Sequence, residues 1–320
     1  MTGVPEGGEA LEFHTPEGER AKWPVRPVSE RQSPGSAFQV RELRCGDGSV
    51  VLQKRLVGLQ PRGAAKALSL LEAEIRVLLR LIRVFAHQEY PHAFVRLVGF
   101  DFDVSEPFLL AEPPAAPPVS ARIGRMTAEE RHRFLVELFS AARLLECAWV
   151  VHGGLSPETV CWDPSASRVQ ITDFASGRLA GEQRLPPPDR QWAAPGPLRA
   201  PGPAELRDDL FSAAQVAYNA VTAAPIRAGG PPANLSLHAH LHALPAAAFH
   251  PDPAQRPGPM QILNALGAPD PWTGGLDAYN PLTAGHERFR SVMERKRNTN
   301  VSGSPPRPRT HPSGGPDARP

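Results

Sequence analysis

The side chains best suited to acid–base or metal chemistry are concentrated in residues 151–179, VHGGLSPETVCWDPSASRVQITDFASGRL. This stretch contains His152 and the carboxylates Glu158, Asp163 and Asp173. A positioned carboxylate or imidazole accepts a proton from a reacting hydroxyl, and oxygen ligands, carboxylates among them, are those that Mg²⁺ takes in proteins. Asp173 is therefore a candidate magnesium ligand, and a capping role for its carboxylate is the alternative.

Two other features could in principle bind a metal or move a proton. His238 and His242 lie four residues apart, the spacing of one helix face, with His240 between them. A structural zinc site needs four Cys, His or carboxylate ligands and a catalytic one three. No third Cys or carboxylate ligand is evident nearby, so we do not expect zinc there. We expect His152 to be a core residue rather than a base.

The first part of the chain reads as a small sheet with one helix. Residues 38–56 form two strand-like runs around CGDG at 45–48, a sequence typical of a hairpin turn. Apolar residues recur at helical spacing over residues 64–85. Two further strands are expected over residues 94–98 and 107–111.

The rest of the chain is expected to contain helices separated by loops. The run PPAAPP at 113–118 predicts a linker, since proline removes backbone donors and stops helices. Thr127 and Glu130 predict a capping box for a helix that runs to Cys147. Two short strands are expected at residues 160–162 and 169–171, and a Pro-rich loop at 183–207. Three further helices are expected at residues 209–221, 235–244 and 260–266.

Residues 151–179 resemble the catalytic and metal-binding loops of the protein kinase superfamily, where HRDLKPENLL precedes a strand pair and a DFG sequence. His152 occupies the histidine position, and Asp173-Phe174 matches the start of DFG. Upstream, Val51-Leu52-Gln53-Lys54 resembles the VAIK strand, and Lys54 is one of only four lysines in the chain. Glu74 resembles its ion-pair partner, and Glu112 resembles the glutamate that ends the hinge strand.

Downstream, Asp209 resembles the aspartate that anchors the central helix of these kinases, and Arg256-Pro257 resembles their last core motif. The resemblance covers roughly residues 33–268. It implies an α+β, bilobal protein-kinase-like fold, with a small β-rich N-lobe containing one helix and a larger helical C-lobe. The expected parts are a mostly irregular segment 1–32, the N-lobe 33–112, the C-lobe 113–270, and an extension 271–320 that is disordered after about residue 298.

The matched loop lacks the residues that transfer a phosphoryl group. Gly154 stands where an aspartate orients the attacking hydroxyl, and Gly153 stands in place of the loop arginine. Ser156 replaces the loop lysine, and Thr159 replaces the asparagine that binds the second magnesium ion. Ala175 replaces the glycine of DFG. These five changes predict that the loop has no ordinary catalytic turnover.

The resemblance also implies a damaged nucleotide pocket. Gly35 is the only glycine in a suitable place for a phosphate-covering loop, and Leu52 fills the position of the alanine that lies against adenine. Pro114 occupies the hinge position whose N–H would pair with the adenine ring, and proline has no N–H. Ala111, as a small gatekeeper, leaves room behind that site. The vestigial pocket comprises Lys54, Glu74, Glu112 and Asp173, with Gly35, Val40, Leu52, Ala111 and Pro114 around them.

We therefore predict a pseudokinase that acts as a binding scaffold or an allosteric signalling partner, with no cofactor or only weakly bound Mg-ATP. A protein partner is expected at the Pro-rich activation segment 183–207 or at the C-terminal tail, because Pro-rich runs are recognised in extended form. One alternative is a degenerate Ser/Thr protein kinase whose base is Asp163 or Glu158. Another is a small-molecule kinase of the aminoglycoside-phosphotransferase type, whose loop begins HGD; Gly153 fits that pattern, but Gly154 again removes the base.

Composition narrows the classes further. The chain has 320 residues and a net charge of +2, so it shows no bias towards nucleic acid or an acidic membrane surface. Its three cysteines form no CxxC pair, which favours reduced thiols in the cytoplasm. We expect no signal peptide and no membrane-spanning segment. The scarcity of lysine relative to arginine suggests a GC-rich, bacterial coding sequence.

Overall fold

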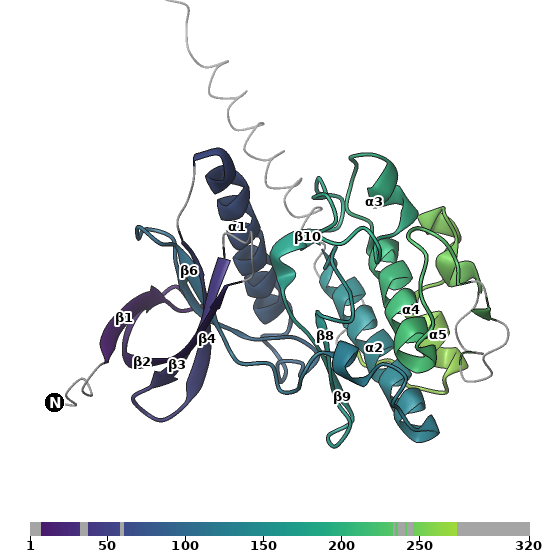
Figure 1. The fold of residues 1–320 in the computed structure, drawn as a ribbon, viewed down its shortest axis with the longest axis horizontal. Helices are drawn as coiled ribbons and strands as arrows, with labels where there is room; N and C mark the ends of the chain where they lie inside the picture. The colour runs from purple at the N-terminus through teal and green to yellow at the C-terminus, as the bar shows by residue number, and fades with distance from the viewer. Residues whose placement is uncertain are drawn as a thin grey trace, which may run out of the picture. The chain divides into compact units, whose positions relative to one another are not determined.

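The computed structural model of the protein describes residues 8–32, 38–57, 61–232, 234–235, 241 and 246–273. Six antiparallel strands from the first part of the chain form a closed barrel in the order β1-β2-β3-β4-β6-β5. Of these, β1 to β4 and β6 carry labels on the left of Figure 1. A single strand pair, His14 with Phe100, joins β1 to β5 and completes the circle. The strands are β1 Glu9–His14, β2 Arg20–Gln32, β3 Phe38–Cys45, β4 Val50–Leu56, β5 Leu97–Asp101 and β6 Phe108–Ala111.

The interior of the barrel explains why β1 and β2 join the sheet. Phe13 and Val25, from the two strands, are fully buried in one apolar cluster with Leu43. The ring of Phe13 meets that of Trp23 edge to face, with centroids 4.9 Å apart. A Cβ atom on Gly99 would lie 2.2 Å from the Phe13 ring, so β5 can pass this ring only because residue 99 is glycine.

The fold class expected from the sequence, a bilobal kinase-like α+β fold with a β-rich N-lobe and a larger helical C-lobe, is wrong. The sheet is a closed six-stranded antiparallel barrel. Two of its strands come from residues 1–32, which were expected to be mostly irregular. Pro27 does not break β2, because it lies beside a bulge and beyond the residues that β1 covers.

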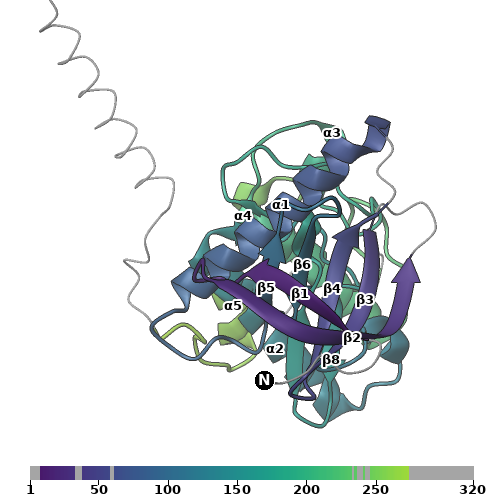
Figure 2. The ribbon, with the colours of Figure 1, turned by 90° about the vertical axis from the view of Figure 1, so that its left-hand side faces the viewer.

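Helix α1, Pro61–Val84, packs against β5 and β6 of the barrel (Figure 2). The predicted hairpin is confirmed by β3 and β4, and the helix predicted at 64–85 by α1. The elements that follow β6 are η1 Val119–Arg122, α2 Ala128–Ala148, β7 Val150–Val151, β8 Val160–Asp163, β9 Arg168–Ile171, η2 Phe174–Ser176, β10 Arg178–Leu179, α3 Pro195–Arg199, α4 Leu206–Thr222, η5 Ala246–Phe249, η6 Pro253–Gln255 and α5 Pro259–Ala265.

Helices α2, α4 and α5 pack together and share one apolar core with α1. The predicted capping box is confirmed: Thr127 Oγ1 accepts from Glu130 N at 3.2 Å, and Glu130 Oε2 accepts from Thr127 N at 2.7 Å. Two antiparallel ribbons, β8 with β9 and β10 with β7, lie between α2 and α4 in the chain. These strands and the loops between them carry the residues of the 151–179 motif.

The chain divides into two compact units, Met1–Ala278 and Tyr279–Pro320. The second unit lies outside the described residues, and so do Gly35, the three histidines 238, 240 and 242, and most of the helix predicted at 235–244. Across the parts of the chain that are described, no helix combines the length and the apolar character needed to cross a membrane.

Candidate functional site

A cavity of about 1090 Å³ lies between the barrel, α1 and the loops that follow α2. Most of the residues proposed from the sequence line it. From the barrel and the linker come Val40, Leu52, Lys54, Ala111, Glu112 and Pro114, from α1 comes Glu74, and from the later loops come Gly154, Ser156, Thr159, Asp173 and Ala175. The fold thus gathers on one cavity residues that are far apart in the sequence.

Three charged side chains meet in this cavity. Lys54 Nζ lies 2.7 Å from Glu74 Oε2 and 2.7 Å from Asp173 Oδ1, so the amine binds both carboxylates at once. The second oxygen of Glu74 accepts from the backbone N–H of Phe174 at 3.2 Å. Lys54 also lies over the ring of Phe38, 4.8 Å from its centroid. The amine is therefore fully engaged by protein groups.

The electrostatics of the three groups follow from burial and from their mutual attraction. Burial alone would lower the pKa of Lys54, but the charges of Glu74 and Asp173 outweigh it and raise this pKa. The Lys54 amine lowers the pKa of Asp173, whose side chain is 55% exposed. Burial raises the pKa of Glu74 against the attraction of Lys54. The cluster thus joins one ammonium to two carboxylates, and Asp173 is its most exposed member.

The imidazole of His152 is part of the core. It is fully buried and meets the ring of Phe174 edge to face at 4.7 Å. Its Nδ1 accepts from the N–H of Gly154 at 3.2 Å, which leaves the proton on Nε2 to be donated to the carbonyl of Thr172 at 2.9 Å. Burial lowers the pKa of His152. With both nitrogens used inside the protein, His152 holds the loop and is not placed to take a substrate proton.

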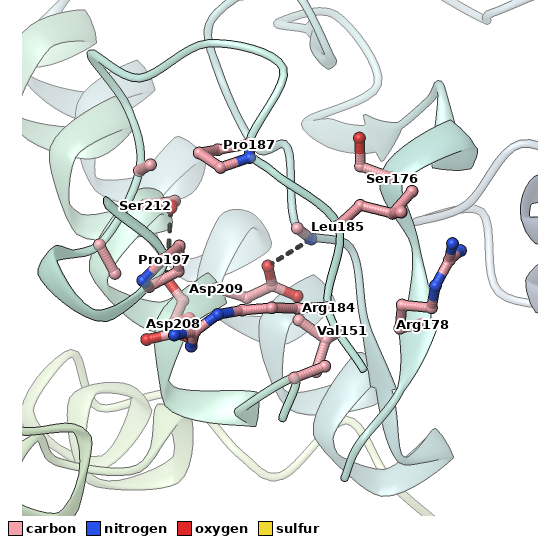
Figure 3. A pocket seen from close by; sticks show the side chains of 14 residues that line it. Val151, Ser176, Arg178, Arg184, Leu185, Pro187, Pro197, Asp208, Asp209 and Ser212 are labelled. Atoms are coloured by element: carbon pink, nitrogen blue, oxygen red, sulfur yellow. Dashed lines mark hydrogen bonds and ion pairs between the residues drawn. The ribbon is translucent and has the colours of Figure 1, made fainter. Parts of the chain in front are cut away.

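The carboxylate of Asp209, near the start of α4, binds the backbone of the loop that begins at His152. Oδ2 accepts from the N–H of His152 at 2.5 Å, and Oδ1 accepts from the N–H of Gly153 at 2.9 Å. Beside it, Asp208 lies 2.8 Å from Arg256 and 3.5 Å from Arg184. Figure 3 shows Asp208, Asp209 and Arg184 at the pocket that they line. Both aspartates and Arg256 are buried. Asp209 and Arg256, the two downstream residues that resemble kinase motif positions, are thus both buried and paired.

In the loop that follows His152, the position of the expected base is Gly154, which has no side chain, and the side chain of Thr159 is poorly placed to bind a metal. Thr159 Oγ1 accepts from Ser156 N at 3.0 Å and lies 3.2 Å from the carbonyl of Gly154, so its hydroxyl braces the loop. Asp173 is the one sequence-predicted magnesium ligand, and it already binds Lys54. Among the described residues, no group of three or more His, Cys, Asp or Glu side chains is placed to hold a metal ion.

Residues 112–115, where the linker after β6 begins, offer no free backbone donor to a ligand. Over residues 112–115, all of them described, the N–H of Glu112 bonds the carbonyl of Arg96 at 3.0 Å. The next two residues are prolines, and the N–H of Ala115 bonds Gln170 Oε1 at 2.9 Å. Gln170 is a partner that the sequence did not point to, because it lies on β9, far along the chain. Leu52 pairs across the sheet with Ala111 and faces the same cavity.

The two carboxylates considered as substitute bases differ in position. Asp163 Oδ1 accepts from Ser165 and Ala166 in the turn between β8 and β9, and it does not line the cavity. Glu158 does line it. Residues 186–189 of the Pro-rich segment also line the cavity, opposite Gly154, and no feature of their sequence had placed them there.

The chain matches no model of a known protein family, and no curated protein matches it. The resemblance to protein kinases therefore rests on the motif residues themselves.

Proposed function

We propose that this protein is a catalytically inactive member of the protein kinase superfamily that acts by binding, as a scaffold or an allosteric signalling partner. The observation that carries the proposal is the loop around Gly154: it is held firmly by Asp209, yet it presents no base where one is needed. The proposal rests on these residues and not on the expected fold class, which the closed barrel contradicts.

Compared with the kinase motifs, the chain retains residues that hold the loops and lacks those that transfer phosphate, which supports this function. The side chains that hold the loops all bind other protein groups: His152, Asp209 and the Lys54–Glu74 pair. Phosphoryl transfer depends on positioning the hydroxyl and neutralising phosphate charge. Gly154 has no side chain to position a hydroxyl. The hydroxyl of Thr159 bonds the carbonyl of Gly154 within the loop, so it does not neutralise phosphate charge.

The proposed partner surface is the Pro-rich segment 183–207, with the C-terminal tail as the other candidate. Pro186, Pro188 and Pro201 are exposed on the described segment, and exposed prolines are ready for recognition in extended form. We place the protein in the cytoplasm, because Cys45, Cys147 and Cys161 are all free and fit a reducing compartment.

The test is a phosphotransfer assay. Purified protein with Mg-ATP or Mn-ATP should label neither itself nor a generic acceptor protein, since losing a positioned base typically costs about 10²–10⁴-fold in rate. Lys54→Ala is the matched control for any trace signal. Clear incorporation of phosphate that Lys54→Ala abolishes would overturn the proposal.

One observation favours a second candidate, a degenerate kinase that still binds nucleotide. The cavity of about 1090 Å³ is large enough for a nucleotide, and Lys54 and Asp173 lie together in it. In this candidate Glu158 is the carboxylate left to act as a base, because Asp163 lies outside the cavity. The same assay separates the two candidates.

A further inference from the structure

Residues 185–189, Leu-Pro-Pro-Pro-Asp, lie beside the loop that contains Gly153, Gly154 and Ser156, and we call them the proline strap. A Cβ atom built on Gly154 would lie 3.0 Å from Cγ and 3.6 Å from Cδ of Pro188. The first distance is tighter than ordinary van der Waals contact. The space that a side chain at position 154 would need is thus already occupied by the strap. Gly154 does not have a positive φ, so its backbone places no other bar on a side chain.

The strap is fixed at its base by a short antiparallel pairing. Arg184 N donates to Gly202 O at 3.0 Å, and Ala204 N donates to Glu182 O at 2.7 Å. The guanidinium of Arg184 then donates to the carbonyls of Ala200 at 2.7 Å and Pro203 at 3.3 Å. These bonds close the loop that carries the strap and tie it to residues just before α4.

The same segment is also tied to α1. Arg76 Nη2 lies 2.7 Å from Glu182 Oε2, and the same oxygen accepts from the N–H of Leu179 at 3.1 Å. On the far side, the hydroxyl of Ser212 in α4 donates to the carbonyl of Trp192 at 2.8 Å. The strap is therefore anchored before and after its proline run.

The sequence of the segment gives it no covalent switch. Residues 177–211 contain no serine, threonine or tyrosine. Phosphorylation, which commonly reorders loops by adding charge for arginines to bind, has no hydroxyl to act on here. Proline also fixes φ and limits the conformations open to the run.

We propose that the proline strap is a built-in cover that holds the acceptor side of the cavity closed. The inference rests on the proposed function, in which Gly154 stands at the base position that an acceptor hydroxyl approaches. Pro188 Cγ lies 3.0 Å from where a Cβ atom of residue 154 would be, and so fills that approach. Pro186 and Pro188 are exposed and Pro187 is half-buried, so the outer face of the cover is solvent-facing while its inner face lines the cavity. This inference concerns access to the loop and is independent of whether the cavity binds nucleotide.

A double-mutant cycle tests the contact itself. Gly154→Ala should lower the Tm by roughly 2–4 °C, because the added methyl group meets Pro188. In a Pro188→Ala background, which lacks Cγ and Cδ, the same change should cost little, so the two effects should not add. An equal loss of Tm in both backgrounds would show that Pro188 does not pack on position 154 and would overturn the proposal.

A labelling experiment tests the closure. Ser156 is buried beside the strap, and the native cysteines are buried as well. A thiol introduced by Ser156→Cys should react slowly with a bulky maleimide. Replacing Pro186, Pro187 and Pro188 with glycine should speed that reaction roughly tenfold, as expected for loss of a local closed state.

The matched control is Ser165→Cys, on the exposed turn between β8 and β9. Its labelling rate should be the same with and without the strap prolines. If the triple glycine variant does not fold, Arg184→Ala removes the anchor instead and should have the same effect. Unchanged labelling at position 156 in a folded variant of either kind means that the strap is not a cover.

Discussion

The carboxylate of Asp209 lies 2.5 Å from the backbone nitrogen of His152, and through this bond helix α4 sets the position of the whole degenerate loop. The other oxygen binds the N–H of Gly153, whose φ of +69° is one that favours glycine. Asp209 itself is almost fully buried. The start of the loop that contains Gly154 is therefore held in place by a buried carboxylate of α4.

Asp209→Ala should lower the free energy of unfolding by about 1–3 kcal/mol, because it leaves the two N–H groups without acceptors. Asp103→Ala is the control, since Asp103 is exposed on the turn between β5 and β6. Urea unfolding measures both. Equal, small losses would mean that Asp209 does not hold the loop.

Asp209 also predicts a pH dependence. Burial raises its pKa to about 7, against the two N–H donors, which lower it. Between about pH 4 and pH 7 the folded state then binds more protons than the unfolded state, so the free energy of unfolding falls as pH rises through this window. The shift of roughly three units corresponds to at most about 4 kcal/mol.

The measurement is urea unfolding of wild type and Asp209→Asn from pH 4 to pH 8. The slope of stability against pH should be smaller in Asp209→Asn, which cannot titrate. Other buried carboxylates, such as Glu74, contribute slopes of the same sign to both proteins. Parallel curves for the two proteins would contradict a raised pKa at position 209.

The Lys54–Glu74 pair should stabilise the fold whether or not any ligand binds. Lys54→Met leaves Glu74 buried without its counter-charge, which should cost about 3 kcal/mol. Glu74→Gln should also destabilise, and the double variant should cost less than the sum. Lys22→Met is a matched control, because it breaks an ion pair of the same 2.7 Å length that is exposed on both sides and should change stability little.

Local signals in the sequence predicted individual elements well but not how the sheet closes. The Thr127 cap, the CGDG turn and the apolar spacing of α1 are all encoded within a few residues. Closure of the barrel depends on one pairing, His14 with Phe100, between residues far apart in the chain. The alternation of Leu11 and Phe13 was a usable signal for β1, but the surrounding prolines and glycines masked it.

At the site too, residues in sequence motifs could be predicted, whereas residues whose role depends on three-dimensional neighbours could not. Motif positions indicated Lys54, Glu74 and Asp173, which the structure brings into one cluster. Gln170 and Pro188 could not be found in that way, because their roles depend on which loop lies beside them in three dimensions. A glutamine on a strand and a proline in a loop carry no signal of their own for a ligand site.

The nucleotide site gives the sharpest prediction: the native protein should show no Tm shift with sub-millimolar Mg-ATP. Leu52 lines the cavity and, by the resemblance to kinases, stands at the position that lies against adenine, where overpacking costs about 1–3 kcal/mol. The adenine ring would also find no free N–H on residues 112–115, which costs a further 1–3 kcal/mol or so. Together these reduce a micromolar affinity by roughly 30-fold to 10⁴-fold.

Two substitutions should reopen the site. Leu52→Ala clears the adenine face, and Gln170→Leu frees the N–H of Ala115, so each should produce a Tm shift with Mg-ATP and the pair a larger one. Leu11→Ala, a half-buried leucine of the barrel outside the cavity, is the control and should lower the Tm without creating a response to ATP. Lys54→Ala in the native background should leave the absence of a response unchanged. Micromolar binding of ATP by the native protein would show that the linker and Leu52 do not close the site, and would make the protein a nucleotide-binding switch.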